Sequence, residues 1–149
     1  MDNTTNEAVL AALRDKMPPG ADIEIPPKVF TDMGGELLDY DEGTALTARF
    51  PVRERYQNPM RTMQGGMIAA AIDNTLGPLS YLVAPPSVTT QLNTSYVRPV
   101  RPDDEYIVVR GWVVEQAGRQ LFLAARARNA ADKTVALSHA TCQIVRRSR

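Results

Sequence analysis

Thiols and imidazoles are almost absent from this sequence, which holds one cysteine, Cys142, and one histidine, His139, in 149 residues. A single cysteine excludes a disulfide within the chain and a zinc site built from thiolates. A single imidazole is likewise too few for a histidine-based zinc site. We therefore expect no metal and no other cofactor, and a reducing, cytoplasmic location is the default expectation.

Long apolar runs, a signal peptide and a net charge are also missing. No stretch approaches 18 consecutive apolar residues, so no membrane span is predicted, and the polar, acidic start does not resemble a signal peptide. Lys+Arg and Asp+Glu both number 17, which favours neither nucleic acid nor a membrane surface as a partner. We interpret the basic residues 146–149 as a solvated end rather than a binding patch.

What the sequence does contain is enough apolar material for one core, because 44% of its residues are hydrophobic. Apolar residues at helical spacing predict an amphipathic helix over residues 4–17, which a Pro-Pro-Gly segment ends. We expect residues 1–20 to form this helix and a linker, and residues 21–149 to form the main domain.

Strand-type residues fill most of the main domain. Two strands are predicted within residues 28–52, on either side of a turn at residues 41–43. Four more are predicted later in the chain, at residues 87–100, 105–116, 119–130 and 133–146. Short connections between these four predict an antiparallel meander. In the first of them, alternation predicts Leu92 and Tyr96 on the face opposite Thr89.

Between the two sets of strands, one long apolar helix is predicted from Gly65 to residue 82 or 83. It is apolar almost all round, which is typical of a buried helix, and Pro78 is expected to kink or shorten it. Small residues share one face of the last strand, as close packing against a helix requires, so His139 on the other face is expected at the surface rather than in catalysis. The predicted fold class is α+β, with a curved antiparallel sheet of five to six strands wrapped around the buried helix.

Asp73 interrupts this apolar helix. A carboxylate is costly to bury among aliphatic side chains, so its position needs a reason. One interpretation is a catalytic base or nucleophile. The other is a structural aspartate held by Asn74, Thr75 or backbone donors.

The spacing around this aspartate resembles that of the hotdog-fold thioesterases of the phenylacetyl-CoA and 4-hydroxybenzoyl-CoA thioesterase type. The pattern that carries the resemblance is Asn58-x5-Gln64-Gly65-Gly66-x6-Asp73. Residues 88–99 end in an aromatic-x-x-Pro and resemble the strand that follows the helix in this family. The resemblance covers residues 30–146. It implies a hotdog fold, hydrolysis of acyl-CoA thioesters and a homodimer, often with dimers pairing into tetramers.

One position departs from the family pattern. The residue before the two glycines is usually histidine in the phenylacetyl-CoA type, and here it is Gln64. An amide donates a hydrogen bond but does not transfer a proton, so Gln64 is left with polarising or positioning a thioester carbonyl. By the same resemblance, Thr89 holds the attacking water and Asn58 orients the carbonyl or the water. Capping of the turn before Pro59 explains Asn58 equally well.

Hydrolysis of a thioester also needs hydrogen-bond donors around the carbonyl oxygen. Gly65 and Gly66 open the long helix, where backbone amides are free and the helix dipole is positive, and they carry no side chain to keep a substrate away. The two glycines are therefore expected either to form an oxyanion site or merely to let the loop turn into the helix.

The distance between these amides and the carboxylate predicts the assembly. Gly65 and Asp73 are eight residues apart on one helix, or about 12 Å at 1.5 Å per residue, so one chain does not easily bring both to one carbonyl. Two helices that run antiparallel across a two-fold axis would do so. We therefore predict an obligate C2 dimer with two sites.

The remaining substrate contacts are less specific. The expected substrate-binding residues are Gly66, Met67, Tyr81 and Arg98. An acyl pocket, if these side chains do not simply fill the core, would be lined by Met60, Met63, Met67 and Tyr81. Candidates for contacts to CoA phosphates are Arg53, Arg55, Arg61, Arg98, Arg101 and Arg119.

The reaction and its substrate leave alternatives open. Aromatic and medium-chain acyl groups are both compatible with the sequence, as is an acyl group carried on a protein. A hotdog enoyl-CoA hydratase would need an Asp/His pair, for which His139 is poorly placed. An acyl-CoA-binding domain without catalysis is the non-enzymatic alternative.

Overall fold

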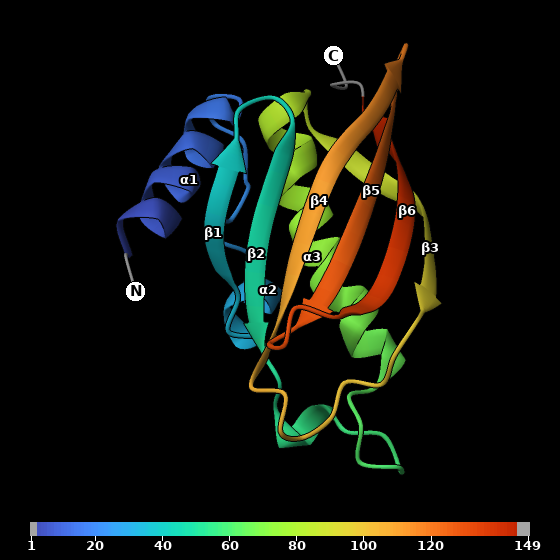
Figure 1. The fold of residues 1–149 in the computed structure, drawn as a ribbon. Coiled ribbons are helices and arrows are strands. Elements are labelled where there is room, and N and C mark those ends of the chain that lie inside the picture. Colours follow the sequence, from blue (N-terminus) through green and yellow to red (C-terminus); the bar gives the residue numbers. More distant parts are fainter. Residues whose placement is uncertain (1–2, 146–149) are drawn as a thin grey trace.

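The computed structural model describes residues 3–145, which form one six-stranded antiparallel sheet around a long helix (Figure 1). The strands are β1 (Glu36–Asp41), β2 (Ala45–Pro51), β3 (Ser87–Tyr96), β4 (Tyr106–Ala117), β5 (Gln120–Asn129) and β6 (Thr134–Ile144). The helices are α1 (Asn3–Lys16), α2 (Lys28–Asp32) and α3 (Gly65–Val83), with a 3-10 turn at Glu54–Tyr56. The predicted fold class is confirmed. The basic residues 146–149 lie outside the described part of the chain.

The strand order across the sheet is β1-β2-β4-β5-β6-β3. The predicted meander is therefore confirmed for β4, β5 and β6 but wrong for β3, which pairs with β6 instead of β4. The physical reason is the length of the connection: residues 97–105 separate β3 from β4, and such a loop can cross from one side of the sheet to the other, which a hairpin turn cannot. As a result, β3 is an edge strand.

The sheet curls over one side of α3 and buries it. Ile72, Leu76 and Leu79 of α3 are fully buried against the sheet. A glycine in β4 makes this close approach possible, because a Cβ added at Gly111 would lie 2.6 Å from Cδ2 of Leu76. The small residues of β6 face the helix as expected, and His139 is exposed on the other face.

Part of the other side of α3 is not covered by this chain. Gly66 and Asp73 are exposed, and Ala69, Ala70 and Gly77 are only partly buried. The expectation of a helix buried all round is thus wrong for the single chain, because one curved sheet covers only one side of a helix. Pro78 does not shorten α3, which continues to Val83, while the expected kink stays a prediction.

The segment before β1 differs from its predicted conformation. Residues 28–32 form the short helix α2 rather than the start of a strand. Phe30 and Met33, three residues apart, are both buried, which a helical turn allows and a strand does not. The ring of Phe30 packs edge-on against Phe50 of β2, with centroids 5.7 Å apart. Tertiary packing of two apolar side chains therefore decides the local structure.

The N-terminal helix α1 packs on β1 and α3. Its apolar stripe of Val9, Leu10 and Leu13 is buried in the common core. Asn6 accepts a hydrogen bond from the backbone N–H of Leu37, with 2.8 Å between Oδ1 and N. The helix is confirmed within one residue at each end, while the division of the chain at residue 20 stays a prediction.

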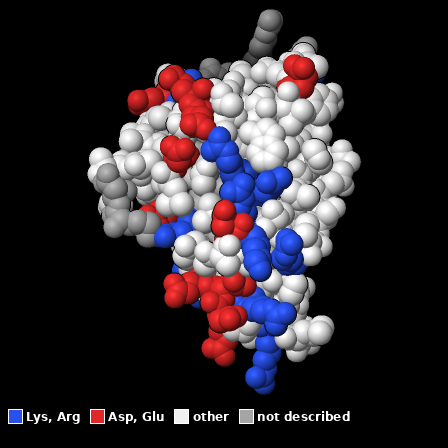
Figure 2. Space-filling view, in the orientation of Figure 1, with Lys and Arg blue, Asp and Glu red and all other residues white. Residues whose placement is uncertain are grey.

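On the face of the molecule seen in Figure 2, charged side chains of both signs form an intermixed band across a mostly uncharged surface. Among the described residues, three arginines of the strands form ion pairs: Arg49 with Glu36, Arg110 with Asp41 and Arg128 with Asp132. Partly exposed pairs of this kind contribute about 1 kcal/mol or less each. Within the described residues, no helix is long and apolar enough to cross a membrane.

Candidate functional site

Asp73 lies near the middle of α3, on the side of the helix that the sheet leaves open. Its carboxylate is exposed in the single chain, so the expected burial is wrong at this level of structure. Thr89 Oγ1 donates a hydrogen bond to Asp73 Oδ1 over 3.2 Å. The structure therefore brings together two of the predicted site residues from different elements.

A β-bulge in β3 turns Thr89 towards α3. Leu92 is paired with Ala140 on the face of β6 that packs on the helix, and plain alternation would place Thr90 on that face next. Thr90 is instead an extra residue in the strand, and Thr89 is the partner of Cys142. Thr89 thus shares a face with Leu92, and the predicted opposite face is wrong because one inserted residue inverts the alternation.

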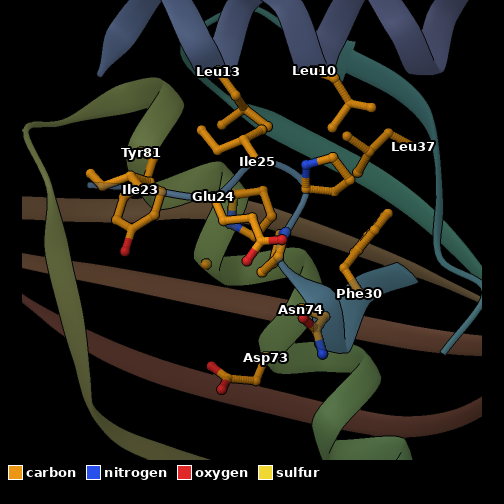
Figure 3. A pocket seen from close by; sticks show the side chains of 14 residues that line it. Leu10, Leu13, Ile23, Glu24, Ile25, Phe30, Leu37, Asp73, Asn74 and Tyr81 are labelled. Atoms are coloured by element: carbon orange, nitrogen blue, oxygen red, sulfur yellow. The ribbon is translucent and has the colours of Figure 1, made fainter. Parts of the chain in front are cut away.

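An apolar cavity of about 240 Å³ opens beside Asp73. Its floor is the open side of α3, where Asp73, Asn74, Gly77, Pro78 and Tyr81 line it. Figure 3 shows Leu10 and Leu13 of α1 on the opposite wall, with Phe30 and Leu37 beside them. The segment 23–27 completes the wall, held in place by the guanidinium of Arg14, which donates to the carbonyl of Ile25.

Most of this cavity wall was not foreseen. Of the side chains expected around an acyl pocket, only Tyr81 lines it. Met63 is buried in the core, Met67 packs partly against the core, and Met60 is 85% exposed. Leu10 and Leu13 were recognisable as the buried stripe of a helix. Their spacing, however, does not indicate that their side chains leave a cavity between α1 and α3.

The N-terminus of α3 presents free backbone amides. Within the described residues, no group accepts a hydrogen bond from the N–H of Gly65 or Gly66, whereas the amides of Met67 and Ile68 donate to the carbonyl of Gln64. Gln64 is the N-cap residue and makes no side-chain cap. This end of the helix therefore offers two donors and the positive end of its dipole.

The two glycines differ in their surroundings. Tyr96 donates a hydrogen bond from its hydroxyl to the carbonyl of Gly65 over 2.7 Å, and a Cβ at Gly65 would lie 3.1 Å from the tyrosine ring. Close packing is thus a structural reason for glycine at position 65. A Cβ at Gly66 would meet nothing within 4 Å, so nothing in this chain requires glycine there.

A second hollow, of about 270 Å³, lies at this end of α3. Gly65 lines it together with Asn58, Tyr96 and Arg98. Asn58 is committed to its own turn, because its Oδ1 accepts from the amides of Met60 and Thr62 and its Nδ2 donates to Thr62 Oγ1. These bonds favour the capping interpretation of Asn58.

Three of the candidate arginines are also partly engaged. Arg98 donates through Nη1 to the carbonyl of Thr134, which leaves its other guanidinium nitrogens available. Arg53 and Arg55 both donate to the carbonyl of Asp32. Among the predicted phosphate contacts, only Arg98 lines the hollow that contains Gly65.

The carboxylate and the free amides do not meet within the chain. α3 is continuous from Gly65 to Val83, so the eight residues between Gly65 and Asp73 span about 12 Å. The two groups also line different hollows. The chain therefore presents the carboxylate and the free amides as two separate sets of groups.

Comparison with solved structures identifies the fold. The E. coli PaaI protein from the phenylacetic acid degradation operon matches with a TM-score of 0.80 and 15% sequence identity, over 96% of this chain and 97% of that one. A phenylacetic acid degradation-related protein from Ralstonia eutropha JMP134 matches with a TM-score of 0.76 and 23% identity, over 91% and 98%. A thioesterase from Haemophilus influenzae matches with a TM-score of 0.72 and 19% identity, over 78% and 81%. The fold is thus the hotdog fold that the sequence pattern implied.

Sequence comparison identifies the family. No curated protein sequence matches this chain. The profile of the thioesterase superfamily matches residues 60–136, just over half of the chain, including all of α3 and the strands β3 to β5. The chain therefore belongs to the thioesterase superfamily, as the pattern around Asp73 indicated.

Proposed function

We propose that the protein hydrolyses acyl-CoA thioesters to the free acid and CoA, at two sites formed across a homodimer. Membership of the thioesterase superfamily indicates hydrolysis of acyl thioesters as the general class of reaction. The finer proposal rests on one observation. Asp73 and the Gly65 amide lie about 12 Å apart on one helix, each beside its own hollow.

The open surfaces of the chain support the dimer. β3 is an edge strand of ten residues whose outer backbone groups are unpaired, and an exposed edge of this kind favours pairing with a second strand. The uncovered side of α3 lies close to β3, as the bond between Asp73 and Thr89 shows. A two-fold axis along this edge sets the two α3 helices antiparallel. Asp73 then faces the partner subunit's Gly65.

The chemistry follows from the two sets of groups. Bound by the amides of the partner subunit's Gly65 and Gly66, the thioester oxygen carries the negative charge that develops during attack. Asp73 either takes a proton from the attacking water or attacks the carbonyl carbon itself, in which case water hydrolyses the resulting anhydride. In both routes the tetrahedral intermediate expels the CoA thiolate, which takes up a proton, and the acid leaves as a carboxylate.

The cavity beside Asp73 would receive the acyl group. An apolar cavity of about 150 Å³ holds benzene, so 240 Å³ holds roughly ten carbon atoms at the same density. This volume favours arylacetyl or short aliphatic chains over long fatty acyl chains. Arg98, in the hollow of the oxyanion amides, is the guanidinium best placed to contact a CoA phosphate.

A thiol-release assay over a panel of acyl-CoAs tests this function. We expect release of CoA, fastest for acyl groups of up to about ten carbons, and a loss of about 10³-fold in kcat for Asp73→Asn, because general bases contribute 10²–10⁴-fold. Asp39→Asn, on an exposed carboxylate of β1, is the matched control and should be silent.

Two outcomes of the same assay would contradict the proposal. Tight binding of acyl-CoA without thiol release would indicate an acyl-binding domain. Consumption of an enoyl-CoA without thiol release would indicate a hydratase. His139 lies on the outer face of β6, away from α3, which weighs against an Asp/His pair.

A further inference from the structure

The small residues of β6 include Cys142, whose thiol has no part in the proposed reaction. Cys142 is 1% exposed and faces α3 directly beneath the site, paired with Thr89 across the strands. Its sulfur lies 3.9 Å from Thr89 Oγ1, and Thr89 Oγ1 lies 3.2 Å from Asp73 Oδ1. The three polar groups thus form a row that runs from the sheet to the candidate carboxylate.

The number of protons available decides which atom donates in each of the two hydrogen bonds. A threonine hydroxyl has one proton to donate, and that proton points to Asp73 Oδ1. Between Thr89 and Cys142, the hydroxyl oxygen must therefore be the acceptor and the thiol the donor. Burial, the largest influence, raises the pKa of the Cys142 thiol above its usual value, so the thiol keeps the proton it needs for this bond at neutral pH.

A second hydroxyl, which unlike that of Thr89 belongs to a buried residue, lies on the same face. Among the described residues, Ser87 Oγ is the buried side-chain polar atom that lacks a hydrogen-bond partner, and Ser87 is 5% exposed. The negative charge of Asp73 adds to the effect of burial and also raises the pKa of Cys142. Thr89 lies directly opposite Cys142 on β3, and Ser87 lies two residues before Thr89, opposite Ile144.

We propose that Cys142 is a positioning residue for the reaction: its thiol donates to Thr89 Oγ1, and this bond directs the Thr89 hydroxyl to Asp73 Oδ1. This row of bonds, Cys142 to Thr89 to Asp73, is the thiol relay. It occupies Oδ1 and leaves Oδ2, which has no partner among the described residues, as the oxygen that acts on water or on the thioester. The role in catalysis rests on the proposed function, whereas the bonds themselves do not.

The thiol relay can be tested without any substrate. The chain has a single cysteine, so its S–H stretching band in the infrared spectrum reports on Cys142 alone. We expect a band at the low frequency of a hydrogen-bonded thiol, and a shift to higher frequency in Thr89→Val, which keeps the shape of the side chain and removes the acceptor. Ser138→Ala is the matched control, because Ser138 bonds Thr94 across the same two strands and should leave the band unchanged. A band that does not move in Thr89→Val would overturn the relay.

Kinetics then test the positioning role. We expect Cys142→Ala to lower kcat about 3- to 10-fold at unchanged KM, the loss of one net hydrogen bond, with Cys142→Ser restoring most of the activity and Ser138→Ala silent. In a Thr89→Val background, Cys142→Ala should change kcat less than about twofold, because the thiol acts only through Thr89. If the loss of kcat in the double variant equals the product of the losses in the two single variants, Cys142 acts by packing and not through Thr89. If Asp73→Asn keeps full activity, the proposed function fails, while the infrared result still decides whether the bonds exist.

Discussion

The two ends of the open side of α3 differ in what they offer. The N-terminal end has free amides and lies in a hollow with Asn58, Arg98 and Tyr96, which suits a charged or polar group. The middle of the helix has a carboxylate beside a cavity walled by leucine, isoleucine and phenylalanine side chains, which suits an acyl chain. In an acyl-CoA, the carbonyl carbon joins an apolar acyl chain to the sulfur atom of the polar CoA group. The two regions therefore offer different groups, about 12 Å apart along α3, as the proposed site shared between two subunits requires.

After Asp73→Asn, removing the amide at the N-terminal end is expected to have the largest effect. Gly65 is the first residue of α3 and follows Gln64 in an extended conformation, so proline at position 65 fits the helix backbone while it removes one N–H donor. We expect Gly65→Pro to lower kcat by about 10²–10³-fold, the usual loss of one oxyanion donor.

Gly65→Ala is the control for this substitution. It introduces the same contact with the ring of Tyr96, at 3.1 Å, but keeps the N–H. Steady-state kinetics of both variants, with circular dichroism to confirm folding, separate the two effects. Equal losses in the two variants would mean that the contact with Tyr96, and not the amide, is what matters.

A mixed dimer tests whether the Gly65 amide of one subunit and Asp73 of the other form one site. A dimer of one Gly65→Pro subunit and one Asp73→Asn subunit has one site with both defects and one site with neither. Purified mixed dimers, isolated by two different affinity tags, should regain about half of the wild-type activity, because one of two sites is intact. Mixed dimers as inactive as their parents would place both groups in the same subunit's site.

Filling the cavity beside Asp73 with a larger side chain tests whether the cavity binds the acyl group. Gly77 lines the cavity, and a Cβ there would meet nothing within 4 Å. We expect Gly77→Leu to raise KM about 10-fold or more for an arylacetyl-CoA and to leave acetyl-CoA unaffected, because a change of pocket size discriminates by 10–200-fold per methylene. Gly77→Ala is the matched control for helix propensity and should change KM little. An equal rise for both substrates would exclude the cavity as the acyl site.

The smallest effect is expected at Asn58. Asn58→Asp keeps the oxygen that accepts from the amides of Met60 and Thr62 and loses only the donor to Thr62. If the side chain serves its turn, kcat should stay within about twofold and the free energy of unfolding should fall by about 1 kcal/mol. A thermal melt and a kcat measurement check both. A fall in kcat of tenfold or more would assign the amide to the substrate.

Patterns along the chain were sufficient where each residue's environment depends on its neighbours in sequence. The run from Gly65 to Val83 contains too few polar residues to be anything but an internal helix, and its bounds were predicted to within a residue. The small residues of β6 likewise indicated a close helix, and they face it. Local periodicity carries this information because helices and strands repeat every 3.6 and 2 residues.

Patterns failed where packing between distant segments decides. The conformation of residues 28–32 depends on a contact between Phe30 and Phe50, twenty residues apart. The direction of Thr89 depends on a bulge that inverts alternation, and a strand of threonines and polar residues contains no apolar rhythm that reveals it.

The sequence by itself determined which groups this protein has: a carboxylate and a pair of glycines on one helix, in a spacing typical of thioesterases. It also determined the strands of one curved sheet, through the alternation of apolar and polar residues. The tertiary structure decided where they lie. One sheet can cover only one side of α3, so Asp73 faces outward. The cavity beside it exists because α1 and residues 23–27 pack against the rest of the chain without filling all of the space over this part of α3. Voids and uncovered faces are properties of how surfaces fit, and no periodicity along a chain encodes them.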